Sequence, residues 1–164
     1  MEEHIYTRLK VSKTHGVKLC LFCEKGVELY DKHIWSLVTG KNTFYLYRHK
    51  VVNGKQIHTL FHRELLGLQD GEIRDHWNGN GLDNRICNLR PATISENNHN
   101  QMIRKDNTSG IKGVIWYKKN QKWRAKINCN GETYQKYFAD KNDAEEWVRA
   151  KREELHKDFA NHGK

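Results

Sequence analysis

Residues 75–97 read DHWNGNGLDNRICNLRPATISEN, and this stretch decides how the chain is organised. It follows neither helical nor strand periodicity until Thr93, where Thr-Ile-Ser-Glu forms a capping box that starts a helix. The run Asn-Gly-Asn-Gly at 78–81 requires a turn, because these residue types tolerate a positive φ. We therefore predict a strand over 72–76, this turn, a second strand over 85–89 and a helix from 93 to about 104.

The same stretch closely resembles the HNH nuclease motif of phage and group I intron homing endonucleases, over about 60–104. The resemblance includes the lead-in Phe61-His62-Arg63 and is specific, because several positions agree in type and spacing at once. It implies a ββα-metal nuclease core. Carried over by position, it makes His76 the general base, oriented by Asn88, and makes Asp75 and Asn97 the ligands of one cation.

The chemistry of these residue types agrees with that resemblance. Phosphodiester hydrolysis needs a base that activates water and a cation that stabilises negative charge on the phosphate. A neutral histidine suits the first task near pH 7, and carboxylate and amide oxygens suit Mg²⁺ or Mn²⁺. Each residue alone is as well explained by a turn or a cap, so the interpretation depends on the whole set. Arg85 and Arg90 are expected to contact phosphate or to brace the loop.

The 60 residues before this motif have the texture of short strands joined by turns. Asn53-Gly54 is a strong two-residue hairpin turn, Asp31–Val38 is expected to form helical turns, and His62–Leu66, closed by Gly67, a short helix. The predicted strands are Ile5–Val11, Val17–Phe22, Gly26–Tyr30, Thr43–Arg48 and Gln56–Leu60. We expect this β-rich region and the motif to form one domain over 1–104.

The rest of the chain predicts a linker at 105–110 and a small domain over 111–164. Three strands are expected near 113–119, 122–129 and 132–138, followed by a helix from about 142 to 159. This segment resembles an AP2-type DNA-binding domain through Thr108–Val114, Lys122–Ile127 and Tyr137-Phe138. The chain is therefore expected to be of the α+β class, with a β-rich region and nuclease core before a three-stranded sheet plus helix.

Strand alternation divides the faces of that predicted sheet. Trp123, Ala125, Ile127, Val114 and Trp116 should face the helix. The resemblance implies that the opposite face contacts DNA, through Lys112, Ile115, Tyr117, Lys119, Arg124, Lys126 and Asn128. Because Ile115 and Tyr117 stand where that family often has arginine, phosphate anchoring is favoured over strict base reading.

The charge distribution supports a polyanionic partner. The chain has 29 Lys and Arg against 20 Asp and Glu, a net charge of +9. The excess is concentrated in residues 101–164, with 15 basic and 9 acidic side chains. Basic residues interleaved with aromatic ones favour double-stranded DNA over a membrane surface, and no apolar run is long enough to span a bilayer.

The four cysteines, at positions 20, 23, 87 and 129, predict no disulfide framework. Cys20 and Cys23 have the spacing of zinc ligands, but no second pair of ligands accompanies them. Because Val17, Leu19, Leu21 and Cys23 alternate as a strand would, we interpret these cysteines as small apolar residues.

Together these features predict a metal-dependent, site-specific DNA endonuclease that nicks one strand per monomer with one Mg²⁺ or Mn²⁺. No heptad repeat predicts a dimer, and no obligatory protein partner is expected. The opening residues carry no secretion signal, so we expect a cytoplasmic protein, and the resemblance implies a phage-infected host cell. The alternatives are a non-catalytic DNA-binding regulator on the same scaffold and a nuclease without sequence preference.

Overall fold

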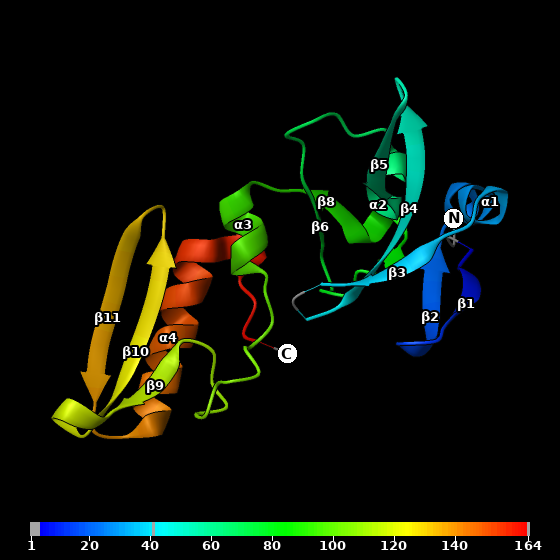
Figure 1. The fold of residues 1–164 in the computed structure, drawn as a ribbon. Helices are drawn as coiled ribbons and strands as arrows, with labels where there is room; N and C mark the ends of the chain where they lie inside the picture. The colour runs from blue at the N-terminus through cyan, green and yellow to red at the C-terminus, as the bar shows by residue number, and fades with distance from the viewer. Residues whose placement is uncertain (1–3, 41, 164) are drawn as a thin grey trace. The chain divides into compact units, whose positions relative to one another are not determined.

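A computed structural model describes residues 4–40 and 42–163, and it has mixed α and β structure with several small sheets (Figure 1). The chain forms two compact units, one ending at Ala92 and the other beginning at Thr93. This boundary falls earlier than the predicted linker at 105–110. The helix that follows Thr93 therefore belongs to the second unit.

The first unit contains three small sheets, in the strand orders β1-β2-β7, β3-β4-β5 and β6-β8. Pairing is antiparallel except between β2 and β7, which run parallel. The elements are β1 (Tyr6–Ser12), β2 (Gly16–Phe22), α1 (Glu24–Lys32), β3 (Ser36–Thr39), β4 (Phe44–Val52), β5 (Lys55–Leu60), α2 (Phe61–Leu66), β6 (Arg74–His76), β7 (Asp83–Asn84), the 3₁₀ turn η1 (Ile86–Asn88) and β8 (Leu89–Pro91).

Aromatic side chains form the centre of the first unit's core. Trp35 is 1% exposed, and its ring lies edge-on to that of Phe61, with centroids 4.7 Å apart. Phe22 lies on the other side of Phe61 at 5.0 Å, and Leu46 of β4 is also buried. Such aromatic contacts add to the gain from burial alone, so this cluster holds β2, α2 and β4 together.

Two of the predicted elements between residues 26 and 38 are wrong. Gly26–Tyr30, predicted as a strand, lies inside α1, and the predicted helical turns at Asp31–Val38 give way after Lys32 to β3. A short apolar run fits the helical repeat and the strand repeat equally well, and here packing decides which of the two forms. In the helical form Val27 is buried and Tyr30 stacks against Phe22 at 5.0 Å.

The predicted hairpin turn at Asn53-Gly54 is confirmed. Asn53 has φ 49° and Gly54 has φ 74°, and the turn joins β4 to β5 with Val52 opposite Lys55. A two-residue loop with positive φ at both positions matches the twist of the flanking strands. The sequence therefore set the register of this hairpin.

The strand predicted at 85–89 is replaced by the turn η1 and the short strand β8. The amide of Asn88 donates to the carbonyl of Arg85 at 2.9 Å, which closes the 3₁₀ turn. Only Leu89–Pro91 then pairs with β6. The predicted arrangement of strand, turn and strand survives, with its second strand shifted along the chain.

The second unit consists of one three-stranded sheet and its helices. The strand order is β11-β10-β9, all antiparallel. The elements are α3 (Ile94–His99), β9 (Val114–Tyr117), η2 (Lys118–Asn120), β10 (Lys122–Cys129), β11 (Glu132–Phe138), α4 (Lys141–His156) and η3 (Lys157–Phe159). The three predicted strands and the long helix are thus present.

Helix α3 begins as predicted and ends early. Thr93 and Glu96 form both bonds of the capping box, but the helix stops at His99, not near Arg104. The residues around its end are asparagines, which are weak helix formers. The side-chain amide of Asn161 donates to both the carbonyl and the side-chain oxygen of Asn100, directly after the last residue of the helix.

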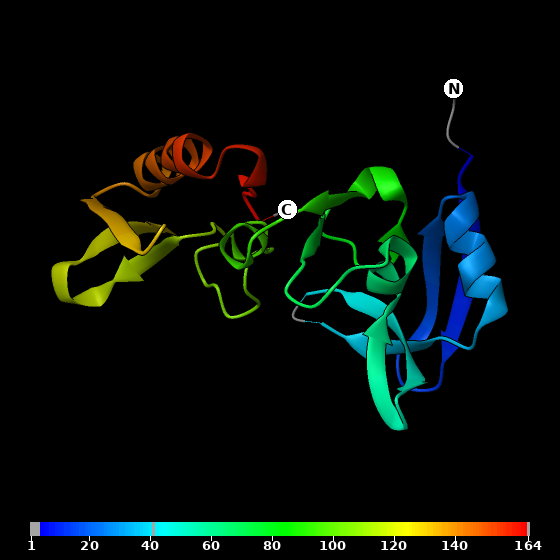
Figure 2. The ribbon, with the colours of Figure 1, turned by 90° about the horizontal axis from the view of Figure 1, so that it is seen from above.

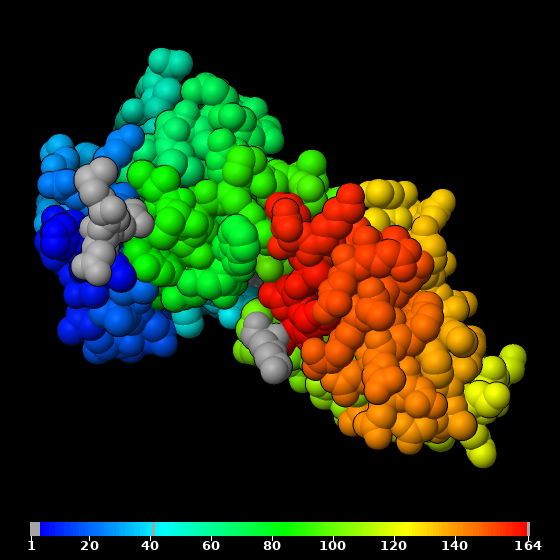
Figure 3. All heavy atoms as spheres, turned by 180° about the vertical axis from the view of Figure 1, so that it is seen from behind, coloured from blue at the N-terminus to red at the C-terminus, as the bar shows by residue number. Residues whose placement is uncertain are grey.

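Helix α4 lies along one face of the sheet, as Figures 1 and 2 show. Its stripe at every fourth residue, Ala144, Val148, Arg152 and His156, is buried. The first two pack on Val114 and Ala125, which are 0% exposed. The outer face of α4 covers much of the second unit's surface when it is seen from behind (Figure 3).

None of the helices in the described part of the chain has the length and apolar character needed to cross a bilayer.

Candidate functional site

The predicted base and its neighbouring carboxylate lie together on β6 in the first unit. Asp75 and His76 are each 5% exposed. Antiparallel pairing places Asp75 opposite Arg90 and His76 opposite Leu89 of β8. Nε and Nη2 of Arg90 donate to Oδ2 of Asp75 at 3.1 and 2.9 Å, so this buried carboxylate is engaged in an ion pair.

Asn88 closes the turn that follows His76. Its Nδ2 donates to the carbonyl of Asp83 at 2.9 Å and to Oδ1 of Asn78 at 3.1 Å. Its Oδ1 accepts from the amide of Asn78 at 3.1 Å. Asn88 therefore fixes the path of the turn between β6 and β7, where the resemblance had implied that it orients His76.

Asn84 is the residue beside His76 that the sequence analysis missed. Its Oδ1 lies 3.5 Å from Nε2 of His76, a long contact for a hydrogen bond. Asn84 is 0% exposed, and its Nδ2 has no hydrogen-bond partner among the described residues. The one indication that the sequence offered was the place of Asn84 directly after Asp83 in the motif. The structure adds that this asparagine is buried on a two-residue strand, where it has no packing role.

Two rings complete the surroundings of His76. The ring of His62, on α2, is edge-on to that of His76 with centroids 5.0 Å apart, and the ring of Tyr45 on β4 lies at 5.7 Å. His62 is 7% exposed. The sequence analysis noted His62 only in the lead-in and gave it no role. Three elements distant in sequence thus meet at His76.

Burial governs the protonation of these groups. It lowers the pKa of His76 below its usual value, against the opposing effects of Asn84 and Asp75. Burial, with the nearby His76, lowers the pKa of His62 to about 3. Burial acts to raise the pKa of Asp83, but the Arg85 guanidinium outweighs it and the pKa is lowered. At neutral pH the site therefore combines uncharged imidazoles with the charged Asp83 carboxylate.

Of the two predicted metal ligands, only Asp75 lies in this unit. Asn97 lies in the first turn of α3, is exposed, and belongs to the second unit. The oxygen donors of Asp75 and Asn97 suit Mg²⁺ by their chemistry.

Arg85 and Arg90, predicted to contact phosphate or to brace the loop, both bind carboxylates within the first unit. Nε and Nη2 of Arg85 donate to the two oxygens of Asp83 at 2.8 and 2.7 Å. Arg90 is held by Asp75 and lies 5.0 Å from the ring of Trp77. Both arginines thus brace the turn, which is one of the two roles that the sequence predicted for them.

The predicted division of faces in the second unit's sheet is largely confirmed. Ala125 and Ile127 are buried, and Trp123 packs against the core cluster with them. Trp116 is the exception. It lies edge-on to Trp123 at 5.2 Å, but at 42% exposed it is not covered by the helix.

The residues predicted to contact DNA on the opposite face show three kinds of surroundings. Lys126, Asn128, Ile115 and Lys119 are exposed. Arg124 is half-buried, with its guanidinium 5.3 Å from the ring of Tyr117. Lys112 differs from the others, because its ammonium donates to the carbonyls of His99, Gln101 and Asn161. Burial lowers the pKa of Lys112 to about 8, and its role here is to join the chain ends of this unit.

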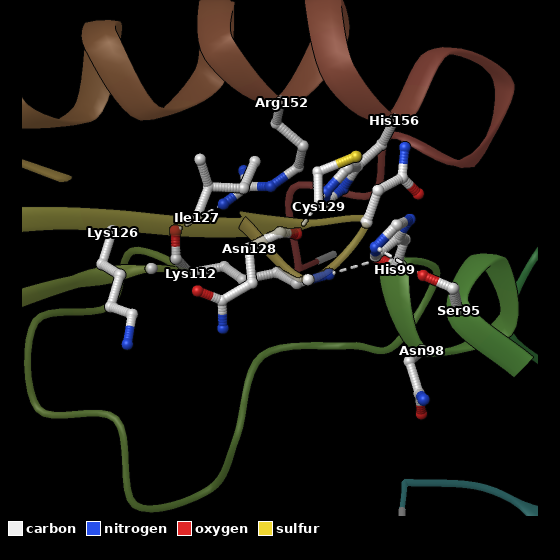
Figure 4. A pocket seen from close by; sticks show the side chains of 13 residues that line it. Ser95, Asn98, His99, Lys112, Lys126, Ile127, Asn128, Cys129, Arg152 and His156 are labelled. Atoms are coloured by element: carbon white, nitrogen blue, oxygen red, sulfur yellow. Dashed lines mark hydrogen bonds between the residues drawn. The ribbon is translucent and has the colours of Figure 1, made fainter. Parts of the chain in front are cut away.

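A cavity of about 390 Å³ lies in the second unit, between α3, β10 and α4 (Figure 4). Its lining includes His99, Cys129 and His156, whose ligating atoms lie within 4.8 Å of one another. The sequence analysis missed this group. The fourth-residue spacing of Ala144, Val148, Arg152 and His156 on a predicted helix was a usable indication.

The interpretation of Cys20 and Cys23 as small apolar residues is supported. Both are buried, and Cys20 lies in the core cluster of the first unit. Burial raises the pKa of Cys20 to about 11, which disfavours the thiolate that binds metals. Cys87 is exposed, and Cys129 is buried in the second unit.

The fold and the two clusters define a class: a two-unit protein with a buried His–Asp–Asn site in one unit and a basic sheet backed by a helix in the other. The chain belongs to the family of Protein 3.8 of Escherichia phage T7. It is 37% identical to that protein over 93 residues, which make up 57% of this chain and 77% of the phage protein. No family model matches the chain, and no solved structure matches it significantly.

Proposed function

We propose that the chain is a metal-dependent DNA endonuclease of the HNH type that nicks one strand of double-stranded DNA. The observation that carries this proposal is the surroundings of His76. A neutral histidine lies beside carboxylate and amide groups on a turn that Asn88 holds in place. Buried polar groups gathered in this way are costly for folding, which is why such clusters mark functional sites.

In this proposal His76 accepts a proton from the attacking water. Its pKa lies below the ordinary value, so the imidazole is uncharged and able to accept a proton at neutral pH. The Oδ1 of Asn84, 3.5 Å from Nε2 of His76, supports a role for Asn84 in orienting the ring. Asn88 contributes by fixing the turn between β6 and β7.

Asp75 would bind the Mg²⁺ or Mn²⁺, which would stabilise charge on the phosphate and on the leaving oxygen. Asn97, the second ligand that the resemblance implied, is exposed on the first turn of α3 in the second unit. Arg90 holds the Asp75 carboxylate in one orientation. The ion pair with Arg90 thus positions Asp75 in this proposed site.

The second unit would supply affinity for DNA. Lys126 and Asn128 alternate with buried Ala125 and Ile127 on β10, so they project from the face that α4 does not cover. Lys119 and Arg124 add positive charge near the same strands, and Ile115 offers an apolar contact for thymine methyl groups. Phosphate contacts of this kind position a protein on DNA without reading sequence.

A DNA-binding regulator without catalytic activity is the second candidate. Two observations favour it: Arg90 already occupies the Asp75 carboxylate, and Asp75 and His76 are only 5% exposed. The family relationship to a phage T7 protein supports a phage-infected host cell as the setting for either candidate.

Conversion of supercoiled plasmid to open circles tests the nuclease. The plasmids would carry a library of phage and host DNA, with Mg²⁺, Mn²⁺ or EDTA. Wild type should nick with either metal, and His76→Ala should lose about 10²–10⁴-fold in rate while binding DNA normally. The matched control, His58→Ala, changes an exposed histidine of the same unit and should nick as wild type does. Nicking by His76→Ala at the wild-type rate would exclude the proposed base, and binding without any nicking would favour the regulator.

The salt dependence of DNA binding tests the second unit. Arg124→Ala combined with Lys126→Ala should reduce the slope of log K against log salt by about 0.9 for each lost phosphate contact. Lys55→Ala, an exposed lysine of the first unit, is the matched control. An unchanged slope in the double variant would exclude phosphate anchoring by this face.

A further inference from the structure

Three side chains with metal-ligating atoms meet in the cavity of the second unit, whereas His76 and Asp75 belong to the first unit. His99 comes from the end of α3, Cys129 from the end of β10, and His156 from the last turn of α4 (Figure 4). Their ligating atoms all lie within 4.8 Å of one another. The three elements are far apart in sequence, so only the fold assembles this group.

His156 is already in the state that a metal ligand requires. Its Nε2 lies 3.1 Å from the carbonyl of Asn128 and donates to it, which leaves the lone pair on Nδ1. That Nδ1 is buried and has no hydrogen-bond partner among the described residues, although the side chain is only 8% exposed. A ring N–H bound to a backbone carbonyl, with the other nitrogen left to the metal, is the usual outer-shell arrangement of a ligating histidine.

His99 and Cys129 complete the group. Oγ of Ser95 lies 3.3 Å from Nε2 of His99, and in the tautomer in which Nε2 donates to this hydroxyl, Nδ1 of the ring is left for an ion. The His99 ring stacks on His156 with centroids 3.6 Å apart and planes 3° from parallel. Cys129 is 8% exposed, and its thiol makes only a weak contact of 3.6 Å to the carbonyl of Leu155.

The donor types select the metal. Two imidazoles and one thiolate are the ligands of Zn²⁺, whereas Mg²⁺ prefers oxygen. Around a tetrahedral Zn²⁺ at the usual bond lengths, ligand atoms lie about 3.3–3.6 Å apart. Binding therefore requires the group to close by about 1 Å and the half-buried His99 ring to turn out of its stack. The cavity leaves room for a water as the fourth ligand.

Two of the positive groups that line the cavity, Lys112 and Arg152, are already engaged by the protein. The ammonium of Lys112 donates to three carbonyls, and Nη2 of Arg152 donates to the carbonyl of Lys112 at 2.6 Å. The Cys129 thiolate would partly offset the charge of the ion. These contacts hold α3 and the C-terminal segment against β10 and α4, which are the same elements that the three ligands join.

We propose that His99, Cys129 and His156 bind one Zn²⁺ that fastens the end of α3 to the sheet and helix of the second unit. The ion is separate from the Mg²⁺ or Mn²⁺ of the proposed nuclease. The proposal does not depend on DNA cleavage, because all three ligands lie in one compact unit.

The test uses the full chain, stripped of metal with a chelator under reducing conditions and then loaded with Zn²⁺ or Co²⁺. After gel filtration, elemental analysis should find one Zn²⁺ per chain, and the Co²⁺ form should show a thiolate-to-cobalt charge-transfer band. Cys129→Ser should lose the band and the bound Zn²⁺. Cys87→Ser, which changes an exposed cysteine, should keep both.

Two further measurements keep the test independent of misfolding. Zn²⁺ should raise the thermal midpoint of wild type and of Cys87→Ser, and should leave that of Cys129→Ser unchanged. His156→Gln should lose the Zn²⁺, while His58→Gln, in the first unit, should retain it. Absence of bound Zn²⁺ in wild type, or equal Zn²⁺ and an unchanged cobalt band in Cys129→Ser, would overturn the proposal.

Discussion

His62 makes the stability of the first unit depend on pH. The side chain lies on α2, 7% exposed, with its ring edge-on to that of His76. Burial, with a smaller effect from His76, lowers its pKa to about 3. An unfolded histidine has a pKa of about 6.5. The folded state therefore keeps His62 neutral over a range of pH in which the unfolded state takes up a proton.

The sign and size of the effect follow from that difference. Because the folded pKa is lowered, the contribution to stability is complete above pH 6.5, and it is lost as the pH falls from 6.5 toward 3. Each pH unit within this range costs about 1.4 kcal/mol. Lowering the pH from about 7 to about 4.5 should therefore cost about 3 kcal/mol through His62 alone.

Native-state hydrogen exchange in urea, read on peptides of the first unit, measures this loss in wild type and in His62→Gln. The substitution lowers stability at both pH values, so only the change between them is compared. Wild type should lose about 3 kcal/mol more than His62→Gln on acidification. The carboxylates titrate in both proteins, and their effect cancels in the comparison.

His58→Gln, an exposed histidine on the neighbouring strand β5, is the matched control and should lose as much stability as wild type. An equal loss in wild type and His62→Gln would refute the reasoning, because it would mean that His62 takes up its proton equally in the folded and unfolded states.

Three other predictions concern the two units. Arg90→Gln should destabilise the first unit by about 3–5 kcal/mol in urea unfolding, because it removes the partner of the buried Asp75 carboxylate. Gly113→Ala should lower the second unit's stability by more than the roughly 1–3 kcal/mol of backbone strain, because its Cβ would lie 2.7 Å from a carbonyl oxygen. Gly131→Ala, with a similar φ and open space around the Cβ, measures the effect of the strain alone. If His76 is the base, the nicking rate should rise with pH through a midpoint below 6.5 and level off above it, because the lowered pKa keeps the ring neutral there.

The sequence indicated the elements whose causes are local. The Asn53-Gly54 turn, the capping box at Thr93 and the alternation of Ala125 and Ile127 each depend on a few neighbouring residues, and the structure contains all three. The same holds for the pair Asp75 and His76, which one short strand places side by side.

The elements that were predicted wrongly depend on contacts between residues that lie far apart in the sequence. The run Gly26–Tyr30 becomes helical because Val27 and Tyr30 then pack in the core of the first unit, beside Phe22. Helix α3 stops at His99, and Asn161, from the other end of the second unit, binds the backbone at Asn100. No local pattern encodes such contacts.

Tertiary structure likewise determined which residues make up the cluster around His76 and the cluster in the cavity of the second unit. The sequence itself determined which chemistry-bearing residues the chain has and which of them a turn or cap holds near one another. Tertiary structure brought Asn84 and His62 beside the His76 ring, and it brought His99, Cys129 and His156 together. The physical reason is that burial and pKa depend on what covers a side chain, and residues far away in the sequence provide that cover.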